Sequence, residues 1–284
     1  MEFTTLGRTG RTVSRLGFGG APAGLTNYLD NYSPTNHDQR EQVIAAIERA
    51  VALGITYFDT APGYGSGASE AIFGEALADA GDEIFVATKI NRDEPNVRAG
   101  IEASLTRLRR DQLDLVQIHG SSYSPDLAAS ILGDGGLLAQ LETLREEGLI
   151  RHLGFTSEDN NGAVFQFIGS NRFDVMQICY NLLHQHAYEP TRPFGSLLEA
   201  DKAGMGTVTM RTLTSGLLQK WIRTVNPADE FDYTPALLQF VLSNPLVDVA
   251  LVGMRTVAEV ERNVAIANES AARIDIAALH AKYV

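Results

Sequence analysis

Short apolar runs recur along the chain, and their starts lie roughly 24 to 42 residues apart. Most runs are apolar at successive positions, which is typical of parallel strands covered on both faces. The spacing leaves room for a crossover connection between parallel strands. The eight runs are 15-RLGFGG-20, 55-ITYFDT-60, 84-IFVATK-89, 113-LDLVQIH-119, 150-IRHLGFT-156, 174-DVMQIC-179, 206-GTVTMR-211 and 248-DVALVG-253.

Between these runs, apolar residues at helical spacing indicate amphipathic helices. The clearest cover residues 38–54, 96–109, 137–148 and 257–267. In the first of them Val43, Ile47 and Val51 fall on one face, and Gly54 marks its expected end. Asn96 can cap the second. The pattern therefore alternates strand and helix.

Eight strand–helix units predict an α/β fold of the (β/α)₈ TIM-barrel type. We expect residues 1–284 to form one such domain, because no proline-rich linker divides the chain. Residues 2–14 look like a short β-hairpin turning at Gly7–Gly10, and this N-terminal hairpin is expected to close the barrel bottom. A doubly wound open sheet is the alternative, but its usual six strands fit the pattern less well.

Composition narrows the classes of partner. The chain has 284 residues, 44% of them hydrophobic, and a formal net charge of −12. A sizeable core is expected, and nucleic acid or an anionic membrane surface is disfavoured as a partner. The first residues do not resemble a signal peptide, and no run approaches the ~18 apolar residues of a membrane helix. Cys179 is the single cysteine, so no disulfide can form within the chain. We expect a soluble, cytoplasmic protein.

The stretch 63-GYGSGA-68 admits three interpretations. It matches the G-x-G-x-x-A pattern of dinucleotide-binding loops, which also require an acidic residue at the end of the next strand. Here that strand ends in Lys89, whose ammonium could instead meet a phosphorylated ribose. The glycines could also simply permit a turn. The third interpretation includes more of the sequence.

Three successive apolar runs end in a functional side chain. Asp59, Lys89 and His119 close the second, third and fourth runs, and Tyr64 opens the loop after the second. In a TIM barrel these strand ends converge on one face, where catalytic groups collect. Because Lys and Asp are rarely buried unless paired, this constellation is best explained by chemistry.

The chain resembles the aldo-keto reductase family from about Leu6 to about Asn268. The motifs that carry the resemblance are 16-LGFGG-20, 58-FDTAPGYG-65, 69-SEAIFGEAL-77, 87-ATK-89, 115-LVQIHG-120, 148-GLIRHLGFTS-157, 177-QICYNLL-183, 213-LTSGLL-218 and 241-VLSNPLVDVALVGMR-255. The resemblance implies reduction of an aldehyde or ketone by a nicotinamide cofactor. It also implies a catalytic tetrad of Asp59, Tyr64, Lys89 and His119.

Each tetrad residue has an expected role. Tyr64 would be the general acid, and a free tyrosine has a pKa of about 10, too high for efficient proton transfer near neutrality. The ammonium of Lys89 would lower that pKa, and Asp59 would hold Lys89 charged and oriented. His119 would donate to the carbonyl oxygen and stabilise its developing charge.

The resemblance also implies a set of cofactor-binding residues. Gly19 and Gly20 would allow close approach of the backbone, and Met210 would lie against the nicotinamide ring. The carboxamide would contact Thr156, Ser157 and Gln177, the pyrophosphate Thr212, Leu213, Ser215 and Gly216, and the adenosine end Gly253, Arg255, Thr256, Glu259 and Asn263. The family usually has Asn where this chain has Ser157. Arg255 favours NADP, because a guanidinium suits phosphate, whereas the carboxylate of Glu259 leaves NAD possible.

Other classes of function remain open at this point. A nicotinamide-sensing regulatory subunit with little turnover, an NAD-dependent sugar or alcohol dehydrogenase working in the oxidative direction, and a phosphate-handling barrel isomerase are the alternatives. His184 and His186 have metal-ligand spacing without an acidic third ligand, so no metal is expected. Cys179 reads as a small buried hydrophobe. Tyr28 and Trp221 lie in loops that could shape a pocket for a small carbonyl or alcohol substrate.

Overall fold

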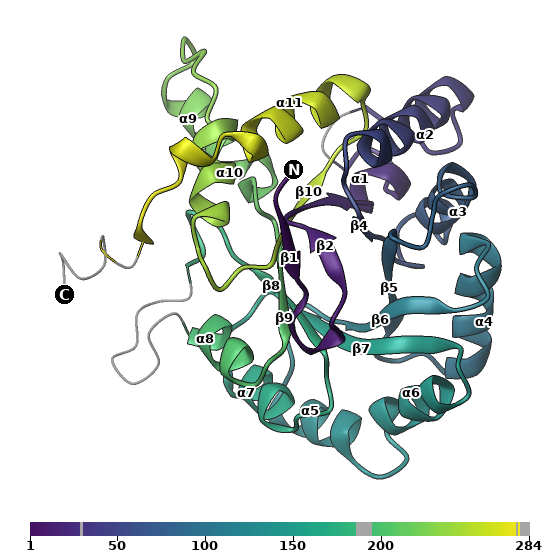
Figure 1. Ribbon diagram of the computed structural model, residues 1–284. Coiled ribbons are helices and arrows are strands. Elements are labelled where there is room, and N and C mark those ends of the chain that lie inside the picture. The colour runs from purple at the N-terminus through teal and green to yellow at the C-terminus, as the bar shows by residue number, and fades with distance from the viewer. Residues whose placement is uncertain (29–30, 186–194, 277, 279–284) are drawn as a thin grey trace.

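Eight parallel strands form a closed barrel in the computed structural model, which describes residues 1–28, 31–185, 195–276 and 278 (Figure 1). Each strand pairs with the next along the chain, and the last pairs with the first. The strands are β3 (Leu16–Gly19), β4 (Tyr57–Asp59), β5 (Phe85–Asn91), β6 (Leu113–His119), β7 (Ile150–Ser157), β8 (Val175–Cys179), β9 (Gly206–Met210) and β10 (Val249–Gly253). The predicted (β/α)₈ barrel is confirmed.

Helices surround the barrel (Figure 1). They are α1 (Ala21–Gly24), α2 (His37–Ala52), α3 (Ala68–Ala76), α4 (Val97–Leu108), α5 (Pro125–Leu132), α6 (Leu137–Glu146), α7 (Gly162–Gly169), α8 (Gly195–Lys202), α9 (Leu217–Val225), α10 (Thr234–Leu242) and α11 (Val257–Asn268). The four helices predicted from periodicity are α2, α4, α6 and α11. Asn96 caps α4 as expected, since its side chain accepts a hydrogen bond from the backbone N–H of Ala99.

The N-terminal hairpin closes the lower end of the barrel. Strands β1 (Phe3–Thr5) and β2 (Thr12–Ser14) pair antiparallel, joined by a 3₁₀ turn over Gly7–Thr9. Leu6 and Val13 are fully buried and pack in the same interior cluster as Tyr57 and Phe85 of the barrel strands. The hairpin is therefore part of the barrel core, as the sequence predicts.

Alternation along the strands decides which side chains face the barrel interior. On β6, Val116 and Ile118 pack in the cluster between strands and helices, whereas Leu115 belongs to the interior cluster. Because successive strand residues point to opposite faces, Gln117 and His119 share the interior direction of Leu115. The same alternation turns Asp59 and Lys89 inward.

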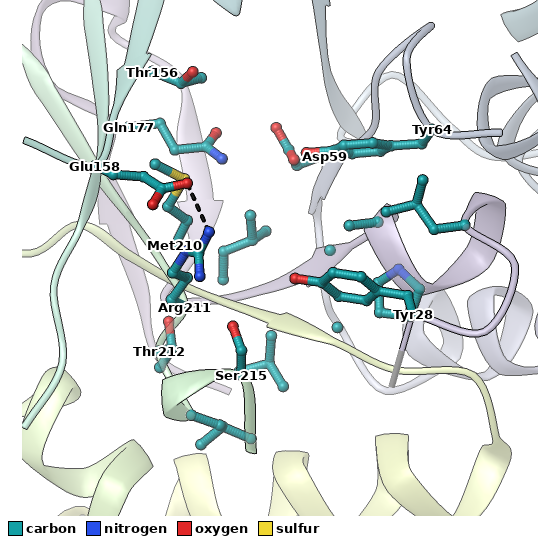
Figure 2. A pocket seen from close by; sticks show the side chains of 18 of the residues that line it. Tyr28, Asp59, Tyr64, Thr156, Glu158, Gln177, Met210, Arg211, Thr212 and Ser215 are labelled. Atoms are coloured by element: carbon teal, nitrogen blue, oxygen red, sulfur yellow. Dashed lines mark hydrogen bonds and ion pairs between the residues drawn. The ribbon is translucent and has the colours of Figure 1, made fainter. Parts of the chain in front are cut away.

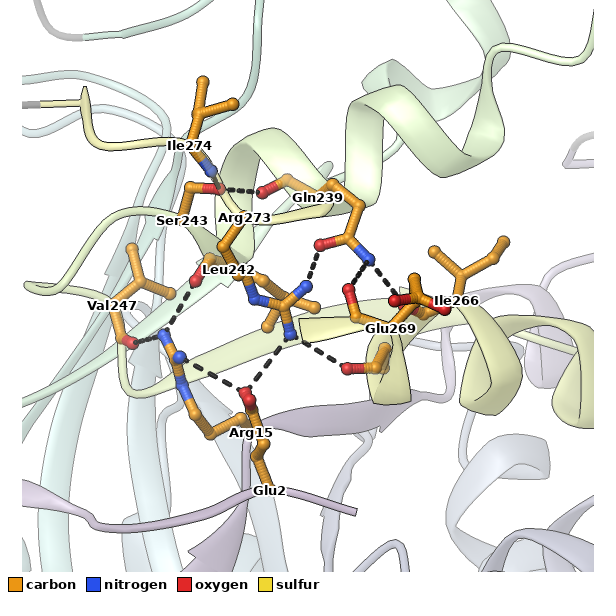
Figure 3. A network of polar contacts seen from close by, with 11 residues as sticks. Glu2, Arg15, Gln239, Leu242, Ser243, Val247, Ile266, Glu269, Arg273 and Ile274 are labelled. Carbon is orange, nitrogen blue, oxygen red and sulfur yellow. Dashed lines mark hydrogen bonds and ion pairs between the residues drawn. The ribbon is translucent and has the colours of Figure 1, made fainter. Parts of the chain in front are cut away.

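A polar network joins the N-terminal segment to the segment after α11, beside the start of β3 (Figure 3). One carboxylate oxygen of Glu2 lies 3.5 Å from Nη1 of Arg15 and 3.2 Å from Nη2 of Arg273. Arg273 also donates to the side chain of Gln239, whose amide nitrogen donates to the carbonyl oxygens of Ile266 and Glu269. These contacts hold the segment after α11 against the N-terminal strand.

No helix among the described residues is both long and apolar enough to cross a membrane.

Candidate active site

A cavity of about 420 Å³ lies at the carboxyl ends of the barrel strands (Figure 2). It is lined by Gly19, Ala21, Pro22, Leu25, Tyr28, Asp59, Tyr64, Lys89, His119, Gly120, Ser121, Thr156, Glu158, Gln177, Met210, Arg211, Thr212, Leu213, Ser215, Gly216, Gln219, Leu251, Val252, Gly253 and Glu259. All four residues of the predicted tetrad therefore meet at one cavity, in the position that a TIM barrel uses for catalysis.

Asp59 and Lys89 form a buried ion pair. Nζ of Lys89 lies 2.6 Å from Oδ1 of Asp59 and donates a second hydrogen bond, of 2.8 Å, to the backbone oxygen of Thr60. Burial alone would lower the pKa of Lys89, but Asp59 and Tyr64 together outweigh burial and raise it. Lys89 is therefore an ammonium at neutral pH, held by two acceptors on β4 and the residue that follows it.

Tyr64 and His119 complete the group. The ammonium nitrogen of Lys89 lies 4.9 Å from the centroid of the Tyr64 ring, and the Tyr64 and His119 rings are edge to face with centroids 5.8 Å apart. The loop that carries Tyr64 is tightly packed, because a Cβ on Gly65 would lie 2.1 Å from the carbonyl oxygen of Gly24. Gly65 also has φ of +69°, which favours glycine. Sequence and packing thus fix the phenol beside the ammonium.

Burial and charge oppose each other at Tyr64. Burial raises the pKa of Tyr64, and Lys89 lowers it in the expected direction without overcoming burial. The phenol is therefore protonated at neutral pH, as a proton donor must be. Burial, with a smaller effect from Lys89, lowers the pKa of His119 to about 4. Neutral His119 can donate from one ring nitrogen without carrying charge.

Gln117 is a polar residue of the barrel interior that the sequence analysis did not single out. It is fully buried, and its amide nitrogen lies 3.1 Å from Oδ2 of Asp59 and 2.9 Å from Oε1 of Gln177. Asp59, Gln117 and Gln177 come from β4, β6 and β8, and alternate strands of a TIM barrel supply one layer of interior side chains. A glutamine two residues before His119, on the same face of the strand, was the available signal.

The residues expected around the nicotinamide differ in their access to the cavity. Thr156, Gln177 and Met210 line it, whereas Ser157 does not. The hydroxyl of Ser157 is fully buried and lies 3.0 Å from the backbone oxygen of Asp159 and 3.3 Å from that of Ser121, the two acceptors for its single hydrogen. A role for Ser157 in cofactor binding stays a prediction, and this geometry favours one in shaping the loop.

The expected pyrophosphate loop lines the cavity throughout, through Thr212, Leu213, Ser215 and Gly216. Thr214 and Ser215 have φ of +57° and +51°, an uncommon conformation for residues with a side chain. Gly216 is the N-cap of α9, and in the first turn of that helix the backbone N–H of Leu218 donates to the hydroxyl of Thr214 at 3.2 Å, so the loop and the helix start are held together at the edge of the cavity.

At the far end, Gly253 and Glu259 line the cavity, while Arg255, Thr256 and Asn263 do not. Oε2 of Glu259 accepts hydrogen bonds from the backbone N–H groups of Arg255 and Thr256, at 2.7 and 3.0 Å, in a capping box at the start of α11. The Arg255 guanidinium lies over the ring of Tyr32, 4.6 Å from its centroid. A carboxylate thus faces the end of the cavity where the sequence predicts the cofactor's adenosine.

The two predicted glycines differ in the same way. Gly19 lines the cavity and Gly20 does not. The N–H of Gly20 donates to the backbone oxygen of Asp59 at 2.7 Å, and a Cβ there would lie 2.7 Å from the hydroxyl of Ser69. Gly20 is therefore required for close packing of β3 on β4.

An ion pair between Glu158 and Arg211, also absent from the sequence analysis, forms the wall opposite Tyr28 (Figure 2). Nη2 of Arg211 lies 2.6 Å from Oε1 of Glu158. Arg211 has φ of +56°, and its carbonyl oxygen accepts a hydrogen bond from the buried amide of Asn181. These two residues follow Ser157 and Met210 directly, and that adjacency was the available signal.

Other candidates from the sequence lie apart from this cavity or lack partners for chemistry. Among the described residues no group of three metal-ligating side chains is present. His184 forms an isolated bridge with Asn181, and His186 lies outside the described residues. Burial raises the pKa of Cys179 to about 11, so its thiol stays protonated. Trp221 is 53% exposed and does not line the cavity, whereas Tyr28 does.

The sequence also matches a family model. Residues 15–237 match the model described as Aldo/keto reductase family. The chain belongs to the aldo/keto reductase family. This aldo/keto reductase is 28% identical to L-galactose dehydrogenase from Arabidopsis thaliana over 95% of its own length and 89% of the relative's. It is 26% identical to a methylglyoxal reductase from Escherichia coli, covering 89% of this chain and 88% of that one.

Solved structures share the fold of this aldo/keto reductase. An aldo-keto reductase from Bacillus halodurans in its holo form superposes with a TM-score of 0.73 at 24% identity, over 94% of this chain and 91% of that one. An aldo/keto reductase from Klebsiella pneumoniae in complex with NADP and acetate gives a TM-score of 0.72 at 20% identity, over 94% and 90%. At these identities the likeness concerns the fold.

Proposed function

We propose that this aldo/keto reductase interconverts an aldehyde or ketone and its alcohol by hydride transfer with NADP(H), with Tyr64 as the general acid and base. One observation carries the proposal above the others: the Lys89 ammonium lies between the Asp59 carboxylate and the Tyr64 ring. A buried cation beside a phenol is the arrangement that lets a phenol give up a proton and take it back.

The residues around the cavity fit a nicotinamide dinucleotide. The cavity has the volume of a typical cofactor site and runs from the tetrad to Gly253 and Glu259. Gly216, on its wall, has open space where a Cβ would stand. Thr156 and Gln177 would hold the carboxamide, Met210 would pack on the ring, and Ser215 with Gly216 would contact the pyrophosphate.

The bound nicotinamide would supply a hydride to the carbonyl carbon, or remove one from the alcohol. The protein's own residues handle the oxygen and the proton. Neutral His119 would donate a hydrogen bond to the carbonyl oxygen and orient it toward Tyr64. Tyr64 would deliver its phenolic proton to that oxygen, and Lys89 would stabilise the phenolate left behind. Asp59 would keep the ammonium charged throughout.

NADP is the proposed cofactor, with NAD possible. The Klebsiella pneumoniae neighbour was crystallised with NADP, and a second one with NADPH. In this chain Arg255 supports a 2′-phosphate, while Glu259 at the end of the cavity opposes it through like charge.

Fluorescence titration with NADPH and NADH, followed by steady-state assays over a panel of carbonyl compounds, tests the proposal. We expect saturable binding and turnover. A Tyr64→Phe variant should bind the cofactor normally and lose about 10²- to 10⁴-fold in turnover, the usual worth of a general acid. Near-normal turnover in Tyr64→Phe would show that Tyr64 is not the general acid. Cofactor binding without turnover of any compound would instead favour a regulatory sensor. The buried Lys89 counts against that alternative, because a sensor has no chemical need for it.

A second candidate is the oxidation of a sugar or other polyol by the same site. The relative named L-galactose dehydrogenase covers nearly the whole chain. Glu158, Arg211 and Tyr28 give the cavity an acceptor, several donors and an aromatic face, which suits a substrate rich in hydroxyl groups. Assays with NAD⁺ and NADP⁺ over neutral sugars and simple alcohols test this. A preference for simple apolar alcohols would count against it.

A further inference from the structure

Gln117 connects the proton-donating group to the part of the cavity expected to hold the nicotinamide. Its amide nitrogen has two hydrogens and two acceptors, Oδ2 of Asp59 at 3.1 Å and Oε1 of Gln177 at 2.9 Å. A carboxylate can only accept hydrogen bonds, so the amide must turn its N–H₂ end toward Asp59. The orientation of Gln117 follows from Asp59, and the orientation of Gln177 follows from Gln117.

The effect on Asp59 concerns how its charge is shared. One carboxylate oxygen accepts from Lys89 and the other from Gln117. Without the Gln117 donor, only Lys89 and Gln177 would satisfy the carboxylate in its buried site, so it would attract the Lys89 proton more strongly. Lys89 would then stabilise a Tyr64 phenolate less well.

The effect on Gln177 concerns which end of its amide the cavity meets. Because Oε1 of Gln177 accepts from Gln117, the amino group of Gln177 is left to face away from Gln117. That amino group also hydrogen-bonds Asp59, and Gln177 lines the cavity. Without Gln117 the amide of Gln177 would keep only its contact with Asp59, so it would be held less firmly toward a bound carboxamide.

We propose that Gln117 is a positioning residue that sets both the acidity of Tyr64, through Asp59 and Lys89, and the orientation of Gln177 toward the nicotinamide. The inference rests on the proposed function of the site. Gln117 itself is fully buried and does not line the cavity. It acts through its neighbours, so its loss should change two measurable properties that otherwise vary independently.

The groups that face Tyr64 limit what else could move its titration. In the described part of the chain they are Lys89 on β5, Asp59 on β4, His119 on β6 and Tyr28 from the loop after β3. Of these four described residues, Gln117 hydrogen-bonds Asp59. A shift of the Tyr64 titration in a Gln117 variant therefore reports on the Asp59–Lys89 pair.

Gln117→Met is the first test, because methionine has similar size and no N–H donor. We expect NADPH, measured by fluorescence titration, to bind about tenfold more weakly, the loss of roughly one hydrogen bond. We also expect the basic limb of the pH–kcat/KM profile for carbonyl reduction to move to higher pH, since the phenol becomes less acidic. NADPH affinity within twofold of wild type, or an unmoved limb, would overturn the proposal.

Gln117→Glu separates the two effects and serves if the methionine variant does not fold. Burial beside Asp59 would keep the new carboxyl group protonated, and its single O–H would go to the charged acceptor. We expect the basic limb to stay at its wild-type position while NADPH affinity falls as in Gln117→Met. Loss of both properties, or retention of both, would contradict a residue with two separate hydrogen-bonding duties.

Gln239→Met is the matched control. Gln239 is another buried glutamine that donates to two acceptors, in the network near the chain ends (Figure 3). This variant should lose stability and leave both the NADPH affinity and the pH limb unchanged. If wild-type protein shows no turnover, the proposed function fails, while the comparison of NADPH affinity still tests Gln117.

Discussion

Nζ of Lys89 lies 2.6 Å from Oδ1 of Asp59, and both side chains are almost completely buried. Removing one member leaves the other as an uncompensated buried charge. The same contact therefore carries both stability and proposed chemistry, and the two can be measured separately.

Lys89→Met should impair both properties. We expect the free energy of unfolding to fall by about 3 to 5 kcal/mol, the usual cost of breaking a buried pair. Turnover should fall at least 10²-fold, because Tyr64 loses the cation that stabilises its phenolate. Urea denaturation and steady-state kinetics measure the two effects. Unchanged stability would mean that Asp59 is neutral in the folded protein.

His119 should make the protein less stable in acid. Its pKa falls from 6.5 to about 4 on folding, so the unfolded chain binds more protons between these values. Stability from this group is complete above pH 6.5 and is lost as the pH falls toward 4, by about 2 to 3 kcal/mol. Unfolding of wild type and His119→Gln at pH 4.5 and 7 checks this. The variant should lose less stability on acidification, and an identical loss in both proteins would contradict the prediction.

Asp248 should make the folded protein less stable as the pH rises, the opposite of the effect of His119. Burial raises its pKa from 3.8 to about 6, so the folded chain binds more protons in that interval and its stability falls as the pH rises through it. Asp248→Asn keeps an acceptor for the backbone N–H of Thr207, which lies 2.9 Å from Oδ2. We expect the variant to be about 1 to 2 kcal/mol more stable at pH 7.5 and no more stable at pH 4. Equal gains at both values would point to packing instead of charge.

The stability changes due to His119 and Asp248 fall in overlapping pH ranges, between about pH 4 and 6, and partly cancel there because they have opposite signs. The pH dependence of wild-type unfolding alone would therefore hide both, and each is visible only as a difference between wild type and its variant.

Glu259→Gln should change the choice of cofactor. The amide still accepts the backbone hydrogen bonds at the start of α11 but carries no charge near a 2′-phosphate. We expect NADPH to bind about tenfold more tightly and NADH to change little. Fluorescence titration with both nucleotides measures the ratio. Glu261→Gln is the control, because this carboxylate pairs with Arg49 and does not line the cavity. A parallel change for NADH and NADPH would exclude charge as the cause.

Much of this architecture could be predicted, because each strand and helix of a parallel barrel leaves a local pattern of hydrophobic residues in the sequence. Asp59, Lys89 and His119 each end an apolar run, and the fold brings strand ends together whatever the loops do. Positions where the chain leaves a strand are different. Ser157 and Gly20 match motifs of the family, yet the Ser157 hydroxyl contacts the backbone oxygen of Ser121 and the Gly20 N–H donates to that of Asp59. These contacts depend on packing between segments that are far apart in the chain.

The residues that were missed are instructive for the same reason. Gln117 sits inside an apolar run, where hydrophobic pattern alone gives no weight to one polar side chain. The Glu158–Arg211 pair joins residues 53 apart in sequence, and Arg211 reaches it from a left-handed backbone conformation that no local pattern indicates. To predict Gln117 and the Glu158–Arg211 pair, one must know which strand positions lie in the same interior layer and which residues after the strands lie side by side at the cavity.

The hairpin that packs Leu6 and Val13 into the barrel closes one end of it, which limits the directions from which ligands can reach the cavity. Side chains fill the barrel between the hairpin and the cavity at the carboxyl ends of the strands, so cofactor and substrate must both approach from the side of the strand-end loops.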